Sequence, residues 1–356
     1  MKRENFIKSV LLATASTLIP FEKIIPNNSN NSSNIDLFGK KIIKPKKLKK
    51  GDTVALVAPG SYISKEELEE SIKKINALGF NTVYSDKILN QTGYLAGDDL
   101  SRAEDLMEKF EDKNIDGIIC VRGGYGCVRI LPFLDYKIIR KNPKVLVGYS
   151  DVTALMFGIF KNSKLITFHG PVAISTFNDF SIRNFNSVLT ENEYPKKFTN
   201  ATEDLDENPY GVTTIVKGKA KGKLIGGNLS IMVSLIGTDY DVSYDDAIVF
   251  IEEVSEEPYR IDRMLTQLIQ AKKFDNAAGI MMGIFRKCEP KTEEPSFSKS
   301  FTLMEVIQDR LSNLKIPVIY GMSFGHIKNK FTIPFGANAI LDTEEQTFVL
   351  EESPVI

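Results

Sequence analysis

Three side chains of this sequence have the types needed for acyl transfer. Ser150 lies in a Gly-Tyr-Ser-Asp turn between an apolar run and a helical pattern. A serine at such a strand–turn–helix corner projects its hydroxyl out of the sheet, as in a nucleophile elbow. Glu252 ends a second apolar run, and His326 follows a glycine. A serine nucleophile needs a histidine as general base and a carboxylate to orient it, so the chain order Ser, Glu, His is compatible with a triad.

Each of these residues also has a plainer interpretation. Ser150 could simply cap a helix that begins at Asp151, because Val152 replaces the second glycine of the elbow motif. Glu252 could be a solvated strand end. A lone histidine is more often structural than catalytic, and His169 is an equal candidate for the general base.

A glycine-rich loop, Arg-Gly-Gly-Tyr-Gly at 122–126, follows another apolar run. Its backbone N–H groups could cradle a phosphate, donate to a carbonyl oxygen, or only form a tight turn. The loop matches neither GxGxxG nor a P-loop, so nucleotide binding is weakly supported. The N–H of Asp151, at an expected helix N-terminus, is another candidate donor to an oxyanion. Cys127 could be an activated thiol, although small buried cysteines are commoner.

Alternating strands and helices position these residues. Strands are expected at 53–58, 80–84, 115–121 and 145–147, and helices at 64–78, 98–110, from 127 to about 134, and 151–160. Ser64 and Glu67 have the spacing of a capping box. The alternation predicts a parallel sheet with helices on both faces, and ligands of such sheets bind at the carboxyl ends of strands. Both glycine-bearing turns lie at such ends.

The second half of the chain has a mixed pattern. Strands are expected at 216–225, 247–251 and 278–284, and helices at 230–235, 260–271 and 303–314. Short β runs near Val318, Thr332 and Ile340 are expected to close the domain. The polar segment 178–208 is expected to be irregular. We therefore predict a leader and disordered linker at 1–43, an α/β domain at 44–177, an interdomain connection at 178–212 and a β/α domain at 213–356.

Composition narrows the functional classes. The chain has 356 residues, of which 42% are hydrophobic and 26% charged, as in soluble globular proteins. A formal net charge of -1 provides no basic field for nucleic acid. The two histidines and three cysteines (Cys120, Cys127 and Cys288) form neither a metal motif nor a disulfide framework, so no metal and no cofactor are expected.

The N-terminus has the features of an export signal. A basic start precedes the apolar run 10–15, and the polar tract 26–34 follows. The apolar run is too short to span a bilayer, so no stable membrane insertion is expected. These features predict export to the periplasm or medium, and the alternative is a disordered tail on a cytoplasmic protein.

Seven short segments resemble, in the same order, motifs of the LD-carboxypeptidase family, which includes murein tetrapeptide carboxypeptidases and microcin C immunity peptidases. They are 121–126 (VRGGYG), 147–151 (VGYSD), 168–171 (FHGP), 226–229 (GGNL), 252–254 (EEV), 258–263 (PYRIDR) and 325–326 (GH). Each segment alone is weak evidence. The resemblance extends over roughly 44–350.

The resemblance implies a fold, a site and a reaction. The family's triad would fall on Ser150, Glu252 and His326, and its oxyanion and substrate donors on Asp151 and the loop glycines Gly124 and Gly123. It also implies a flavodoxin-like N-terminal domain, a smaller mixed β/α C-terminal domain and a homodimer. Ser150 is then expected within hydrogen-bonding reach of His326.

The implied reaction is removal of a C-terminal D-amino acid from an L-centre of a murein tetrapeptide, without a cofactor. Cleavage of aminoacyl- or peptidyl-nucleotide antibiotics and non-catalytic binding of muropeptides are the alternatives. Glu253 stands where the family often has aspartate, so the sequence leaves open which of the two adjacent carboxylates contacts the histidine.

Overall fold

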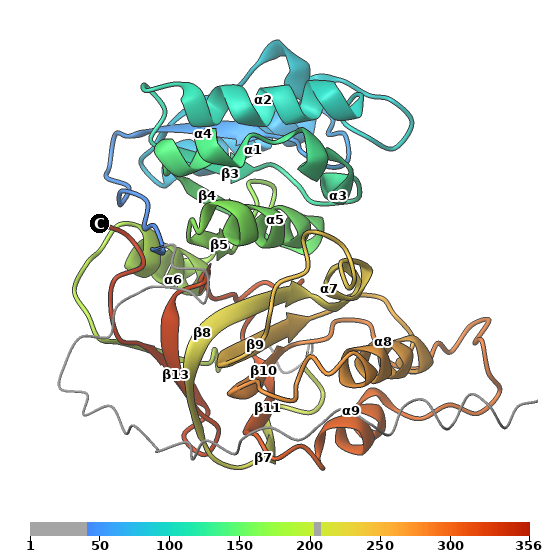
Figure 1. The fold of residues 1–356 in the computed structure, drawn as a ribbon. Coiled ribbons are helices and arrows are strands. Elements are labelled where there is room, and N and C mark those ends of the chain that lie inside the picture. The colour runs from blue at the N-terminus through green and yellow to red at the C-terminus, as the bar shows by residue number, and fades with distance from the viewer. Residues whose placement is uncertain (1–40, 203–207) are drawn as a thin grey trace, which may run out of the picture. The chain divides into compact units, whose positions relative to one another are not determined.

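Two β-sheets and their helices make up the described part of the molecule (Figure 1). The computed structural model describes residues 41–202 and 208–356, and these belong to one compact unit with a continuous hydrophobic core. The predicted export leader lies outside the described residues, as does nearly all of the predicted linker. Within the described ranges no helix combines the length and apolar character that crossing a membrane would need.

The first sheet has the flavodoxin-like strand order predicted for the N-terminal region. Its five parallel strands run in the order β2-β1-β3-β4-β5. They are β1 (Thr53–Val57), β2 (Asn81–Val83), β3 (Gly117–Cys120), β4 (Val145–Gly148) and β5 (Thr167–His169). All residues of β3, β4 and β5 are buried, as expected for strands covered on both faces.

A strand from the far end of the chain extends this sheet. β12 (Ile333–Phe335) pairs antiparallel with β5. The prediction that the β run near Thr332 closes the second domain is therefore wrong. A short, apolar, β-branched segment predicts a strand. Which of the two sheets the strand joins depends on the tertiary fold.

Helices and short 3₁₀ turns connect the strands of the first sheet. They are α1 (Lys65–Ala77), η3 (Asp86–Leu89), α2 (Asp99–Glu111), α3 (Cys127–Ile130), η4 (Leu131–Phe133), α4 (Tyr136–Lys141), η5 (Ser150–Val152) and α5 (Thr153–Ser163). The capping box of α1 is present: the Ser64 hydroxyl accepts from the Glu67 N–H at 3.1 Å, and the Glu67 carboxylate accepts from the Ser64 N–H at 2.9 Å.

Helix α5 joins the two sheets. It lies between the first sheet and β8 (Figure 1), and most of its residues are buried, which is typical of a helix enclosed on all sides. Its first residue, Thr153, accepts a hydrogen bond from the Asn228 N–H of the second sheet at 3.0 Å. The residue that follows the Ser150 turn is therefore tied directly to the other half of the structure.

The second sheet is mixed, as predicted. Its eight strands run in the order β6-β14-β13-β8-β9-β10-β11-β7, with a parallel centre of β8 to β11 and antiparallel flanks. They are β6 (Lys196–Thr199), β7 (Thr213–Val216), β8 (Lys219–Asn228), β9 (Ala247–Glu252), β10 (Gly279–Gly283), β11 (Val318–Met322), β13 (Asn338–Asp342) and β14 (Thr347–Leu350). Its helices are α7 (Leu229–Ser234), α8 (Pro258–Gln270) and α9 (Leu303–Leu311).

The segment expected to be irregular contains regular structure. It forms α6 (Asp179–Leu189), capped by the Asn178 side chain, and then β6 at the edge of the second sheet. The four buried residues of α6 recur at helical spacing behind the Asn178 cap, so the segment carried a helix signal that the interpretation as irregular overlooked. The predicted domain boundaries stay a prediction.

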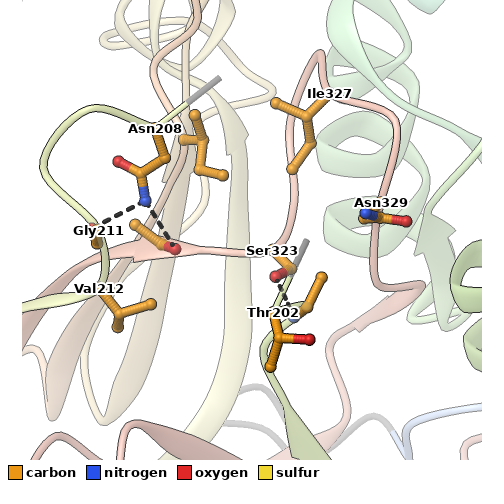
Figure 2. Close-up of a pocket in the computed structure, with 10 residues that line it drawn as sticks. Thr202, Asn208, Gly211, Val212, Ser323, Ile327 and Asn329 are labelled. Atoms are coloured by element: carbon orange, nitrogen blue, oxygen red, sulfur yellow. Dashed lines mark hydrogen bonds between the residues drawn. The ribbon is translucent and has the colours of Figure 1, made fainter. Parts of the chain in front are cut away.

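A cavity of about 220 Å³ lies beside β11 and the loop that follows it (Figure 2). Ser323, Ile327 and Asn329 contribute to its wall together with Asn208 and Val212. Ile327 follows His326 in the chain, but Ser150, Glu252 and His326 do not line this cavity. The cavity is therefore a neighbour of the candidate site.

Candidate active site

Ser150 occupies a strained backbone position at the end of β4. Its φ is +63°, in the left-handed region that costs a non-glycine residue about 1–2 kcal/mol. Neither η5 nor α5 receives a side-chain cap, so the interpretation of Ser150 as a plain helix cap is wrong. Strain of this kind persists where the surrounding structure enforces it, commonly at functional sites. The partly exposed Ser150 side chain has the backbone setting of a nucleophile elbow.

The glycine-rich loop packs directly against the Ser150 turn. A Cβ on Gly123 would lie 3.0 Å from the Ser150 Cβ and 3.1 Å from the Asp151 nitrogen, closer than ordinary contacts. Gly124 has a φ of +79°, which a glycine adopts without strain. The structure thus brings together Ser150, Asp151, Gly123 and Gly124 as the strand-end argument predicted.

Ser61, which the sequence interpretation missed, holds this loop in place. Its N–H donates to the Gly123 carbonyl oxygen at 3.1 Å, and its hydroxyl accepts from the Tyr125 N–H at 3.0 Å. Ser61 follows β1, the strand next to β3. The rule that carboxyl ends of parallel strands meet at one edge could have identified it.

The Asp151 carboxylate is a structural support. It accepts a hydrogen bond from the Cys127 N–H at 2.8 Å and so ties the start of α3 to the Ser150 turn. Burial raises the pKa of Asp151. Burial, followed by the nearby Asp151 charge, also raises the pKa of the Cys127 thiol well above its usual range. A buried, protonated thiol is inert, which argues against Cys127 as an activated nucleophile.

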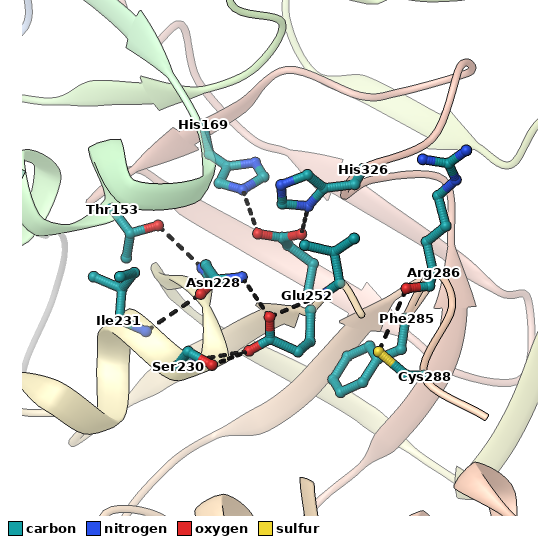
Figure 3. A network of polar contacts seen from close by, with 12 residues as sticks. Thr153, His169, Asn228, Ser230, Ile231, Glu252, Phe285, Arg286, Cys288 and His326 are labelled. Carbon is teal, nitrogen blue, oxygen red and sulfur yellow. Dashed lines mark hydrogen bonds and ion pairs between the residues drawn. The ribbon is translucent and has the colours of Figure 1, made fainter. Parts of the chain in front are cut away.

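Glu252 and His326 form a close pair at the carboxyl edge of the second sheet. Nδ1 of His326 lies 2.7 Å from Oε2 of Glu252 (Figure 3). Glu252 is fully buried, whereas the His326 side chain is 18% exposed. Burial alone would raise the pKa of Glu252, but the charge of a protonated His326, the nearby His169 ring and the contact with Nδ1 of His326 outweigh it and hold the pKa below its ordinary range. An ionised carboxylate only accepts hydrogen bonds, so in the neutral imidazole of His326 the proton lies on Nδ1 and Nε2 keeps its lone pair.

Glu253 has a different set of partners. Its carboxylate accepts from the Asn228 side chain at 3.0 Å, from the N–H and hydroxyl of Ser230 at 2.8 and 2.7 Å, and from the Val254 N–H at 2.8 Å. These contacts fasten the start of α7 to the end of β9. Of the two adjacent carboxylates, the structure therefore places Glu252 on the histidine and uses Glu253 as an anchor.

Tyr149 connects the serine turn to the histidine. Its ring centroid lies 4.8 Å from that of His326, and the Lys330 ammonium lies 4.7 Å from its centre. Burial raises the pKa of Tyr149 to about 12. Within the described residues the Ser150 hydroxyl makes no hydrogen bond with His326, so the expected direct contact is not formed.

Comparisons with known proteins identify the family of this chain. A family model described as the LD-carboxypeptidase N-terminal domain matches residues 54–170, and one described as the LD-carboxypeptidase C-terminal domain matches 221–341. A "Probable murein peptide carboxypeptidase" of Bacillus subtilis is 39% identical over 308 residues, covering 86% of this chain and 94% of the relative. The chain belongs to the LD-carboxypeptidase family.

Other members of this peptidase family are similar over most of their length. The "Microcin C7 self-immunity protein MccF" of Escherichia coli is 28% identical, covering 85% of this chain and 94% of the relative. The solved structure of an MccF-like protein from Bacillus anthracis aligns with a TM-score of 0.76 at 30% identity, covering 86% of this chain and 99% of that one. The resemblance stated from the sequence motifs is thus confirmed.

The described part of this LD-carboxypeptidase family member shows no metal-ligand cluster. Between residues 41 and 202 and between 208 and 356, no three His, Cys, Asp or Glu side chains gather in a way that could hold an ion. All three cysteines are buried and free.

Proposed function

We propose that this protein is a serine carboxypeptidase that removes a C-terminal D-amino acid from an L-centre of a murein tetrapeptide. Ser150 is the nucleophile, His326 the general base and Glu252 the carboxylate that orients His326. The observation that carries this proposal is the 2.7 Å contact between Glu252 and His326, because it leaves Nε2 of His326 as the proton acceptor. The family's relatives, one of which is named a murein peptide carboxypeptidase, support the substrate class.

The proposed reaction proceeds through an acyl-enzyme. Nε2 of His326 takes the Ser150 proton while the serine oxygen attacks the carbonyl carbon next to the terminal D-residue. His326 then returns the proton to the leaving amine. A water molecule, activated by the same imidazole, adds to the ester carbonyl and releases the shortened peptide.

The backbone N–H groups of Asp151 and Gly124 are the proposed oxyanion donors. Gly123 supports this assignment because it lets the loop lie against the Ser150 turn, where any larger residue would contact Ser150 and the Asp151 nitrogen. No hydrogen bond of the described residues uses either N–H. Loss of one such donor lowers turnover by about 10²–10³-fold.

Defined murein tri-, tetra- and pentapeptides, incubated with the purified protein and followed by mass spectrometry, test the proposal. We expect loss of one D-alanine from the tetrapeptide and no cleavage by the Ser150→Ala variant. Binding of the tetrapeptide without turnover would indicate a muropeptide-binding protein instead. Full activity of Ser150→Ala would refute Ser150 as the nucleophile.

A second candidate function is hydrolysis of peptidyl-nucleotide antibiotics. The similarity to the microcin C7 self-immunity protein and to an MccF-like structure supports it. The chain contains no tryptophan to stack on a nucleobase, although tyrosine and phenylalanine can serve. A parallel assay with a peptidyl-adenylate decides between the two substrates by the ratio of kcat/KM.

We also propose export through the N-terminal segment and assembly as a homodimer. The basic and apolar pattern at the N-terminus supports export. The N-terminal sequence of protein recovered from the medium or periplasm would show cleavage, and recovery of the uncut chain from the cytoplasm would contradict it. Light scattering at several concentrations tests the dimer.

A further inference from the structure

His169 lies in an apolar setting beside the proposed triad. It ends β5, opposite Gly148 of β4, and its side chain is 2% exposed. Three aromatic rings surround it, with centroid distances of 5.9 Å to Tyr149, 5.4 Å to Phe250 and 6.1 Å to Phe324. A phenylalanine would pack equally well among these rings. The imidazole at this position is therefore explained by a polar interaction of its nitrogens.

The polar atoms of His169 and Glu252 are left without other partners. Neither ring nitrogen of His169 has a hydrogen-bond partner among residues 41–202 and 208–356, and the same holds for Oε1 of Glu252. Nε2 of His169 and Oε1 of Glu252 lie 3.9 Å apart, within ion-pair distance but beyond a hydrogen bond (Figure 3). A buried polar group without a partner costs about 1–3 kcal/mol, so a small movement that joins these two atoms is favourable.

We propose that His169 is a positioning residue that holds the outer oxygen of Glu252. Its Nε2–H donates to Oε1 and thereby keeps Oε2 directed at Nδ1 of His326. The carboxylate is then fixed between two imidazoles, one at the end of β5 and one in the loop after β11. This inference rests on the proposed function, in which His326 is the general base.

The arrangement has a predictable effect on the pH profile. The titratable and charged groups at this site are Glu252, His326 and Tyr149, the adjacent carboxylate Glu253, the Arg286 guanidinium, and the Lys330 ammonium over the tyrosine ring. Without the His169 donor, the negative charge of Glu252 acts more fully on His326 and favours its protonated form. The proton-accepting form is then lost at a higher pH, whether His169 is neutral or charged.

Three variants separate positioning from packing. His169→Phe keeps an aromatic ring and removes the donor, and we expect kcat to fall by about 10- to 100-fold with little change in KM. The acid limb of the kcat/KM profile moves to higher pH. His169→Gln places an amide N–H near the position of Nε2, and we expect it to restore most of kcat and most of the position of the acid limb. Thr167→Val, on the same strand, removes another buried oxygen that lacks a partner and changes neither.

Two kinetic results would overturn the inference. One is a folded His169→Phe variant with unchanged kcat and acid limb, which would leave His169 with a packing role. The other is a His169→Gln variant as impaired as His169→Phe, because the restored donor would then have no effect.

Nuclear magnetic resonance tests the contact without any substrate. The chain has only two histidines, so ¹⁵N-histidine labelling gives two ring systems, which the His169→Gln variant assigns. We expect the buried ring to carry a proton on Nε2. A ring protonated only on Nδ1 cannot donate to Glu252 and would refute the inference even if the Phe variant fails to fold. An Nε2–H signal in a protein that cleaves no murein peptide would refute only the proposed function.

Discussion

Replacement of the two adjacent carboxylates one at a time separates catalysis from stability. Glu252→Gln leaves the shape of the side chain but offers His326 either an oxygen or an NH₂ group. If the NH₂ group faces Nδ1, the imidazole proton must move to Nε2, and the base loses the lone pair it needs. The wrong tautomer in a triad lowers turnover by about 10⁴-fold. This corresponds to about 5 kcal/mol of transition-state stabilisation.

Glu253→Gln is the matched control, because it is the same change one residue away. Glu253 accepts four hydrogen bonds, and an amide accepts at only one of its two ends. With the NH₂ group on the Ser230 side, the hydroxyl can turn to accept but the Ser230 N–H loses its partner. Loss of that partner lowers the free energy of unfolding by about 1–3 kcal/mol. The contact between Glu252 and His326 is unaffected, so most of the turnover remains.

The assay is kcat for D-alanine release from murein tetrapeptide, with urea unfolding of the same samples. Glu252→Gln should be folded and nearly inactive, and Glu253→Gln active and less stable. The reverse pattern would refute the assignment of the two carboxylates. Near-normal turnover of a folded Glu252→Gln variant would refute Glu252 as the carboxylate that orients His326.

Four further results are expected. Ser150→Gly and Ser150→Ala should both be inactive, but the glycine variant should be more stable by about 1 kcal/mol because it relieves the left-handed backbone; equal melting temperatures would argue against strain. Gly123→Ala should lower kcat by about 100-fold, since its methyl group displaces the Ser150 turn; unchanged kinetics would argue against the close approach. Wild type should be more stable than Glu252→Gln, and this difference in unfolding free energy should have its largest value above about pH 4.3, the ordinary glutamate pKa. It should shrink as the pH falls, because the lowered pKa of Glu252 means that its charged form contributes stability that is lost on protonation; a constant difference would contradict this. Incubation with EDTA should leave activity intact, and activity restored by added metal would refute the proposed mechanism.

Local patterns in the sequence determined the elements and the residue types of the site. The capping box at Ser64, the alternation of strands and helices in the N-terminal half and the turn at Ser150 follow from periodicity, caps and the end of a buried strand, whereas the flavodoxin-like strand order was implied only by the family resemblance. These features depend on neighbours within a few residues, so one sequence is enough to predict them. The motifs in order also identified the family, which the comparisons confirmed.

Only the tertiary structure decided which groups meet. Adjacent residues of a strand point to opposite faces, so Glu252 and Glu253 had to differ, but their partners come from distant segments and are not encoded locally. The pairing of β12 with β5 and the approach of His169 to Glu252 are of the same kind. Each depends on how the two sheets pack around α5, and such long-range contacts have no signature in the spacing of residues along the chain.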